Sequence, residues 1–192
     1  MAAVLNPGIT PIWHLSVDKY HAMIDKGILS PDDAVELLDG VIVQKMSKNP
    51  PHSFATRATR IALERIAPAG WFVDNKEPIT LSGSEPEPDV AVIRGEPRDY
   101  IKRHPGPAEV GLVVEVADAT LERDKILKAP IYAAAGIPWY WVLDLNGGRL
   151  EVYSEPGKAG YMRHTTRQFH DSATVTLDGI AVGDVVISRL LP

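Results

Sequence analysis

The sequence predicts an α/β fold with a mixed β-sheet core, flanking helices and additional antiparallel hairpins. Two near-continuous apolar runs, at residues 88–93 and 111–117, are typical of strands covered on both faces. Residues 121–135 have a helical pattern that stops at Gly136, and residues 137–145 return as a strand. Strand, helix and strand in this order predict a crossover unit and therefore a parallel pair within the sheet.

The elements before this unit can be placed in order. We expect residues 1–12 to form a loosely ordered arm, and a helix to begin at Ser16 and stop at Gly27. Strands at 34–38 and 41–46 flank Asp39-Gly40, a strong hairpin signal. A helix follows from Pro50 to about residue 67, with an apolar stripe made of Phe54, Ala58, Ile61, Ala62 and Ile66.

Shorter elements complete the chain. Residues 71–73 and 79–81 predict short strands that lead to the first apolar run. Residues 94–107 form a loop rich in basic residues, proline and glycine. After Asp144, further strands are expected at 150–153, 160–168, 173–177 and 184–188. With no repeat or long linker, 192 residues predict one domain covering 1–192.

Composition limits the function classes. Apolar residues make up 45% and charged residues 23% of the chain, as in ordinary globular proteins. The chain has no cysteine, which excludes disulfides and thiolate zinc sites, and no apolar run approaches a membrane span. We expect a cytoplasmic protein without a membrane partner. The net charge of −5 argues against coating nucleic acid by bulk electrostatics, but leaves room for a local basic groove.

Two carboxylates lie on the predicted buried strands. Asp89 stands at the mouth of the first strand, and Glu115 interrupts the otherwise apolar second strand. Removing an ionised carboxylate from water costs on the order of several kcal/mol, which is more than one hydrogen bond contributes. Such a carboxylate is therefore paired or bound to a cation. A divalent metal would relieve the repulsion between two such acids. Asp89 and Glu115 are therefore candidates for a shared metal site.

The helix after the second strand brings a lysine toward these acids. Asp124, Lys128 and Tyr132 follow one another at i, i+4 spacing and share a face, because each step drifts by only about 40°. The crossover places Asp124 and Lys128 near the strand end that carries Glu115. We expect Tyr132, like the Trp139-Tyr140-Trp141 run, to pack in the core.

Several ordered motifs resemble the Uma-two family of putative restriction endonucleases. They are Ser84 to Asp89, Arg98-Asp99-Tyr100 with His104 to Pro107, Val114 to Asp118, Leu121 to Asp124, Lys128, Tyr132, and Gly136 to Asp144. The similarity also includes Val35 to Gly40 and the His52 region, so it covers roughly residues 16–155. The resemblance implies a PD-(D/E)XK nuclease with a restriction-endonuclease-like fold.

The resemblance also implies an active site. Asp89 and Glu115 would bind Mg²⁺, with Mn²⁺ as an alternative, and a catalytic lysine would orient or deprotonate water or stabilise the charge on the phosphate. The PD-(D/E)XK pattern places the lysine two residues after the acid, where this chain has Ala117. By similarity to the family the lysine is Lys128 on the following helix, and Lys125 is the next candidate.

Other residues have both a functional and a structural interpretation. Glu36 resembles an early family glutamate that adds a ligand, His52 could face phosphate or water, and Asp124 could hold Lys128. Each could equally be a surface or helix-capping residue, while Glu115 and Lys128 could form a structural ion pair. The basic loop offers DNA contacts to phosphates through Arg98, Lys102, Arg103 and His104.

The leading hypothesis is therefore a Mg²⁺-dependent endodeoxyribonuclease that hydrolyses phosphodiester bonds in DNA. A homodimer would suit a double-strand cut, although no motif encodes it. The first alternative is a catalytically silent nucleic-acid-binding or regulatory module that retains the nuclease fold, suggested by the acidic balance and by Ala117. The second is an interaction protein in which the acids and the lysine form a buried ion network.

Overall fold

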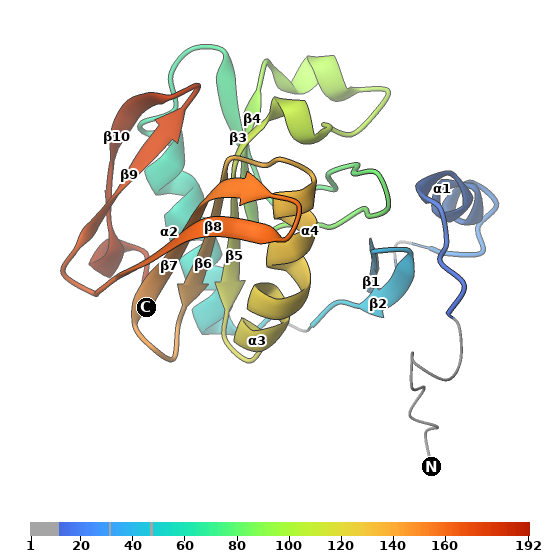
Figure 1. Ribbon diagram of the computed structural model, residues 1–192, viewed down its shortest axis with the longest axis horizontal. Coiled ribbons are helices and arrows are strands. Elements are labelled where there is room, and N and C mark those ends of the chain that lie inside the picture. Colours follow the sequence, from blue (N-terminus) through green and yellow to red (C-terminus); the bar gives the residue numbers. More distant parts are fainter. Residues whose placement is uncertain (1–11, 31, 47) are drawn as a thin grey trace.

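A six-stranded mixed sheet forms the centre of the computed structural model, which describes residues 12–192 except 31 and 47 (Figure 1). Nearly all of the arm expected at residues 1–12 lies outside the described residues. The strand order is β3-β4-β5-β6-β7-β8. The strands are β3 (Trp71–Asp74), β4 (Val90–Arg94), β5 (Val110–Ala117), β6 (Trp139–Asp144), β7 (Arg149–Gly157) and β8 (Gly160–Arg167).

The predicted crossover unit is confirmed at the middle of the sheet. β5 and β6 pair in parallel, with Glu115 opposite Val142, whereas the neighbouring pairs in this sheet are antiparallel. Every residue of β5 is buried, as its continuous apolar sequence predicts for a strand covered on both faces. Glu115 is thus enclosed by the fold and needs polar partners.

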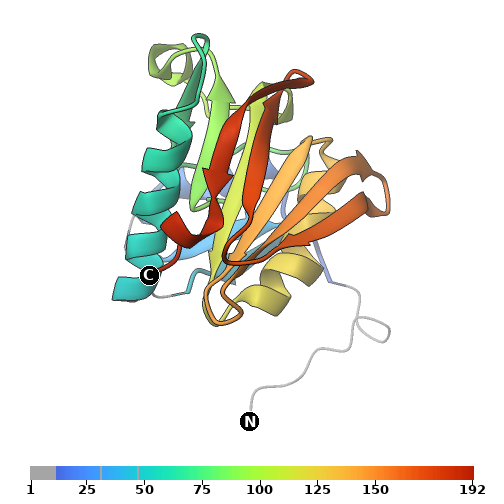
Figure 2. The same cartoon turned by 90° about the vertical axis from the view of Figure 1, so that its left-hand side faces the viewer.

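Different elements cover the two faces of the sheet (Figure 2). One face packs against helix α2 (Pro50–Glu64) and the ribbon of β9 (Ser172–Leu177) and β10 (Ile180–Val186). The other face carries Val113, Val142 and Tyr140, and it packs against the crossover helix. Because side chains alternate along a strand, Glu115 shares this second face with Val113. The acid therefore points toward the crossover helix.

The crossover helix contains a wide turn. It consists of α3 (Leu121–Arg123), a π-helical turn at Asp124–Lys128, labelled η3, and α4 (Ala129–Ala134). Pro130 has no N–H for a regular helical bond, and the N–H of Ala129 donates to the carbonyl of Asp124, five residues back. Tyr140 donates its hydroxyl to the same carbonyl at 3.1 Å. The sequence predicted an uninterrupted helix here, and Pro130 explains the difference.

A small N-terminal unit adjoins the crossover side of the sheet. It contains helix α1 (Val17–Asp25) and the hairpin of β1 (Val35–Leu38) and β2 (Val41–Gln44). The turn residues Asp39 and Gly40 both have positive φ, at 46° and 72°, as a two-residue hairpin turn requires. The hairpin forms as predicted, and β1 carries Glu36 into the interior, where it is 1% exposed.

Two local predictions were wrong: the strand at 79–81, and part of the apolar stripe of α2, of which only Ala62 and Ile66 pack against the core. Residues 79–81 contribute Ile79 and Leu81 to the core but form no strand. The buried face of α2 consists of Ala55, Thr56, Thr59 and Leu63, whereas Phe54 and Ile61 are exposed. The short side chains of Ala55 and Thr59 bring the helix close to the sheet, and this selects a face that hydrophobicity alone does not identify.

Within the described range, no helix has the length and apolar character of a membrane span.

Candidate active site

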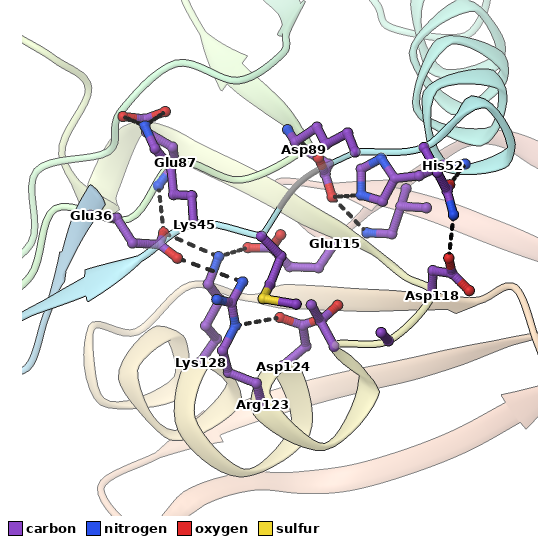
Figure 3. Close-up of a pocket in the computed structure, with 16 residues that line it drawn as sticks. Glu36, Lys45, His52, Glu87, Asp89, Glu115, Asp118, Arg123, Asp124 and Lys128 are labelled. Atoms are coloured by element: carbon purple, nitrogen blue, oxygen red, sulfur yellow. Dashed lines mark hydrogen bonds and ion pairs between the residues drawn. The ribbon is translucent and has the colours of Figure 1, made fainter. Parts of the chain in front are cut away.

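Sixteen residues line a pocket of about 80 Å³ where β4 begins and β5 ends (Figure 3). Residues expected from the sequence to be functional lie in it together: Glu36, His52, Asp89, Glu115, Asp124 and Lys128. They come from β1, α2, the entry of β4, β5 and the π turn. The fold thus gathers residues that are up to 92 positions apart in the chain into one polar pocket.

Asp89 caps the end of the β4–β5 ladder. Val90 pairs with Val114, so the antiparallel register places Asp89 opposite Glu115 on the same face. Asp89 Oδ2 accepts a hydrogen bond from the backbone N–H of Val116 at 3.0 Å, and His52 Nε2 lies 3.1 Å from the same oxygen. The other oxygen, Oδ1, accepts from Lys48 Nζ at 2.8 Å.

Glu115 and Lys128 form the centre of the pocket. Lys128 Nζ donates to Glu115 Oε1 at 2.9 Å, and the hydroxyl of Tyr132 donates to the same oxygen at 3.0 Å. Lys128 Nζ also lies 3.2 Å from Glu36 Oε2. All of these side chains are buried, so the attraction between them is weakly screened by solvent. Lys128 is therefore shared between two buried glutamates.

Two buried carboxylate oxygens at the pocket accept no hydrogen bond from the described residues. They are Glu36 Oε1 and Asp124 Oδ1, and Arg123 nitrogens lie 3.8 and 4.0 Å away from them, respectively. The other oxygen of Asp124 accepts from the hydroxyl of Thr120 at 2.6 Å. Unpaired oxygens in a buried position are costly, and they are suited to receive a cation or a hydrogen-bond donor.

The pKa values of the buried acids reflect how many negative and positive groups surround each of them. Burial raises the pKa of Glu115 to about 8, because Asp124, Asp89 and Glu36 add repulsion that Lys128 only partly offsets. Burial likewise raises the pKa of Asp124. Asp89 differs: burial acts to raise its pKa, but hydrogen bonding and charge from His52 and Lys48 lower it to about 2.

Lys128 responds in the opposite sense to its surroundings. Burial alone would lower its pKa, but attraction to Glu115, Glu36 and Asp124 outweighs burial and holds the pKa above its usual value. The amine is therefore an ammonium group at neutral pH. It can donate hydrogen bonds and stabilise negative charge, and it has no lone pair with which to accept a proton.

Comparisons with known proteins agree with this fold. The family model Uma2, described as "Putative restriction endonuclease", matches residues 17–183. The chain belongs to the Uma2 family. Its fold resembles the crystal structure of a putative nuclease belonging to DUF820 from Anabaena variabilis, with a TM-score of 0.67 and 13% identity. That match covers 92% of this chain and 97% of the other. No curated protein matches the sequence.

These findings confirm the predicted family and the restriction-endonuclease-like α/β fold. They support a nuclease-like function for this Uma2 chain. Ala117 stands two residues after Glu115, where the PD-(D/E)XK pattern would place a lysine. Lys128 reaches Glu115 from the facing helix, 2.9 Å from its carboxylate.

The remaining sequence-predicted residues lie elsewhere. Lys125 Nζ lies 3.7 Å from Glu151 Oε1, outside the pocket. Lys102, Arg103 and His104 line a separate hollow, and Arg98 is exposed on the surface and lines neither cavity. The basic loop therefore faces a second cavity and does not contribute to the acidic pocket.

Some residues of the pocket were not predicted. Lys48 and Arg123 supply cations at its rim, and their side chains are 32% and 24% exposed. Tyr132 was assigned to the core only, yet its hydroxyl also binds Glu115. Asn49 caps α2 and donates to Asp118 at 2.6 Å. The spacing of Tyr132 four residues after Lys128 could have indicated its contact, whereas Lys48 has no comparable signal.

Proposed function

We propose that this Uma2 chain is a metal-dependent endonuclease that hydrolyses phosphodiester bonds in DNA. The observation that supports the proposal best is the meeting of Asp89, Glu115 and Lys128 in one pocket with an excess of buried carboxylates. A site of this charge attracts divalent cations, and a cation would in turn allow an anionic phosphate to approach. The family and its nuclease-like relative support the same reaction class.

The donor set fits Mg²⁺, with Mn²⁺ as an alternative. Within the described ranges, no three His, Asp or Glu side chains form a ready cluster for a metal ion. Mg²⁺ commonly uses only one or two carboxylates and completes its shell with water and substrate phosphate oxygens. Asp89 and Glu115 would supply these carboxylates, and Glu36 and Asp124 each have a buried oxygen that accepts no hydrogen bond from the part of the chain that the structure describes. When bound, the metal would activate water and polarise the phosphate.

The protein's own residues have distinct tasks in this proposal. Lys128 would stabilise the negative charge that grows on the phosphate, since it is a buried ammonium group with rigid partners. Tyr132 would orient Glu115 through their hydrogen bond. Val116 N–H and His52 would hold Asp89 in place. Lys48 would exchange its contact with Asp89 for one with the phosphate of the substrate.

Two measurements test the proposal. Mg²⁺ or Mn²⁺ at a concentration of 100 Kd should increase the free energy of unfolding of the wild type by about 2.7 kcal/mol. The melting temperature should rise accordingly. Asp89→Asn and Glu115→Gln should lose this shift. Supercoiled plasmid should be cut by the wild type and left intact by Lys128→Ala, while the control Glu151→Gln should cut normally. No metal response together with intact plasmid would refute the proposal.

A second candidate function is supported by the lysine contacts. Lys48 and Lys128 already pair with Asp89 and Glu115, so the acids have partners without any metal. This arrangement also suits a nucleic-acid-binding module that does not cut. Such a module would retain DNA without cutting it and would release it as the salt concentration rises.

A double-strand cut would favour a homodimer of this chain. The mass of the protein in solution tests whether it forms one.

A further inference from the structure

A second hollow of about 650 Å³ lies beside the acidic pocket, between α1 and residues 100–106. We call it the lateral groove. Its volume is within the range of sites that bind small molecules or single nucleotides. Its lining includes His21, Glu85, Glu87, Tyr100, Lys102 and Arg103. The groove is therefore lined by both apolar and polar side chains, with Ile24 and Ile101 among the apolar ones.

Glu85 forms the chemically distinctive part of the groove. Its side chain is only 4% exposed, and it is fixed by two donors. His21 Nε2 lies 2.7 Å from Oε1, and the hydroxyl of Thr80 donates to Oε2 at 3.0 Å. His104 Nε2 lies 3.8 Å from Oε1. Since a carboxylate has about four acceptor positions, Glu85 retains capacity for donors from a ligand.

Aromatic and cationic side chains surround this carboxylate. Tyr100 lines the groove, and the guanidinium of Arg103 lies 5.1 Å from its ring centroid. Arg103 is held there by Glu109, at 2.8 Å. Ile101 is 79% exposed, and Lys102 forms no ion pair with the described residues. Flat side chains and a cation next to a fixed acceptor match a nucleobase with its phosphate.

The lateral groove meets the acidic pocket at Glu87. Glu87 lines both, and Lys45, which also lines the pocket, donates to both Glu87 oxygens at 2.8 Å. A nucleic-acid strand whose phosphate lies over Asp89 and Glu115 would thus reach the groove with a neighbouring nucleotide. The Lys45–Glu87 pair would lie beneath the strand between the two positions.

From this geometry we propose that the lateral groove binds an unpaired nucleotide next to the phosphate that is cut. Glu85 accepts hydrogen bonds from the exocyclic amino group of its base. Carboxylates accept from the N4 amino group of cytosine, and thymine has no amino group to offer. The inference rests on the proposed nuclease function and specifies its substrate as a strand with an accessible, amino-bearing base.

Binding without cutting tests the inference. Fluorescein-labelled dC8 and dT8 would be titrated with the full chain in Ca²⁺, which offsets the charge of the acids in place of Mg²⁺, and binding followed by anisotropy. We expect the wild type to bind dC8 about tenfold more tightly than dT8, which is within the range of about 5- to 150-fold that one good base contact provides. Glu85→Gln should bind the two oligonucleotides within about twofold of each other, because the fixed anionic acceptor is removed.

Glu151→Gln is the matched control. Glu151 is also a buried glutamate held by a histidine and a threonine, His164 and Thr166, both at 2.7 Å, but it does not line the groove. This variant should keep the preference for dC8. Equal binding of dC8 and dT8 by the wild type, no binding of either, or a preference that survives in Glu85→Gln would each overturn the inference.

The inference and the proposed function can fail separately. Plasmid cutting in Mg²⁺ without a Glu85-dependent preference would leave the nuclease proposal intact and reject the base site. A Glu85-dependent preference without any cutting would support the base site in a protein that binds nucleic acid.

Discussion

Glu115 and Glu151 occupy equivalent places in the same sheet but have opposite electrostatic surroundings. The register places Glu115, Val142, Glu151 and Thr166 in one row across β5 to β8. Side chains in such a row point to one face, so both glutamates face the crossover helix, two strands or about 10 Å apart. Each is buried, and each has a lysine of the π turn nearby.

Their partners differ in number and charge. Glu151 has His164 and Thr166 at 2.7 Å, Arg149 Nε at 3.0 Å and Lys125 at 3.7 Å. Burial acts to raise its pKa, but the hydrogen bonds from Thr166 and His164 and the two cations outweigh it and lower the pKa. Glu115 shares one ammonium with Glu36 and lies near further acids, and its pKa rises to about 8.

The comparison separates a structural acid from a functional candidate. A buried carboxylate with a complete set of donors has no need of a ligand, whereas one in an acidic surplus has unused capacity for a cation. Burial or ion pairing alone would have identified both Glu115 and Glu151 as candidate functional residues. The balance between acids and cations within reach is what distinguishes them.

Replacing Lys128 by methionine should have the largest effect on stability. The change leaves Glu36 and Glu115 without their shared cation, and breaking a buried pair from one side costs about 3–5 kcal/mol. Chemical denaturation at about pH 9, above the Glu115 pKa of about 8, measures this loss in the free energy of unfolding. The loss should shrink as the pH falls below about 8, where Glu115 becomes protonated. A loss below about 1 kcal/mol would show that the pair is not electrostatically important.

Exchanging each glutamate for glutamine should separate activity from stability. Glu115→Gln should reduce plasmid cutting by about 10²–10³-fold, the usual cost of one key electrostatic group, and should leave stability unchanged or increased. Glu151→Gln should cut within about threefold of wild type and lose about 1–3 kcal/mol of stability, because its donors lose their charged partner. Equal effects of the two changes on cutting would abolish the distinction.

The two glutamates should also differ in the sign of their pH dependence. The folded pKa of Glu115, about 8, exceeds its unfolded value, so the folded state holds the proton more tightly. As the pH rises from about 4.5 to 8, the contribution of Glu115 to the free energy of unfolding therefore decreases, by up to about 1.4 kcal/mol per pH unit. Denaturation of the wild type and Glu115→Gln at several pH values measures this difference.

For Glu151 the folded pKa is lowered, so its contribution is present above the unfolded pKa and is lost as the pH falls through the folded value. Comparison of the wild type with Glu151→Gln in acid should show the wild type losing its advantage. A common sign for both glutamates would contradict their assignment to different electrostatic environments.

Lys125→Met should have the smallest effect. Its ammonium lies 3.7 Å from Glu151 and its side chain is 27% exposed, so the pair is worth about 0–1 kcal/mol. Plasmid cutting should be unchanged, since Lys125 does not line the pocket. Thermal denaturation and the cutting assay together compare it with Lys128→Met. Loss of cutting in this variant would give Lys125 a role that its position does not explain.

Much of the fold could be predicted because the strongest local signals agree with the tertiary structure. The apolar run of β5, the glycine stop at Gly136 and the Asp39-Gly40 turn each specify their element. The face of α2 and the irregular path of residues 79–81 could not be predicted, since both depend on what packs against them. Propensity is only a weak guide at such positions.

The candidate site was predictable where burial conflicts with charge. Glu115 stands out in an apolar strand, and the spacing of Asp124, Lys128 and Tyr132 anticipates their shared face. Lys48 and the Glu85–His21 contact were not predictable, because they join segments 41 and 64 residues apart without a periodic pattern. Contacts of this kind depend on how the N-terminal unit meets the sheet.

The proline-induced wide turn in the crossover helix has a consequence for how the pocket is maintained. Its cause is covalent, because Pro130 has no N–H to donate in any state of the protein. The carbonyl of Asp124 is also satisfied from within, by Ala129 and Tyr140. The irregularity therefore does not require a bound ligand. Lys128 already has its position in the ligand-free protein, and the entropy cost of ordering its side chain is met during folding.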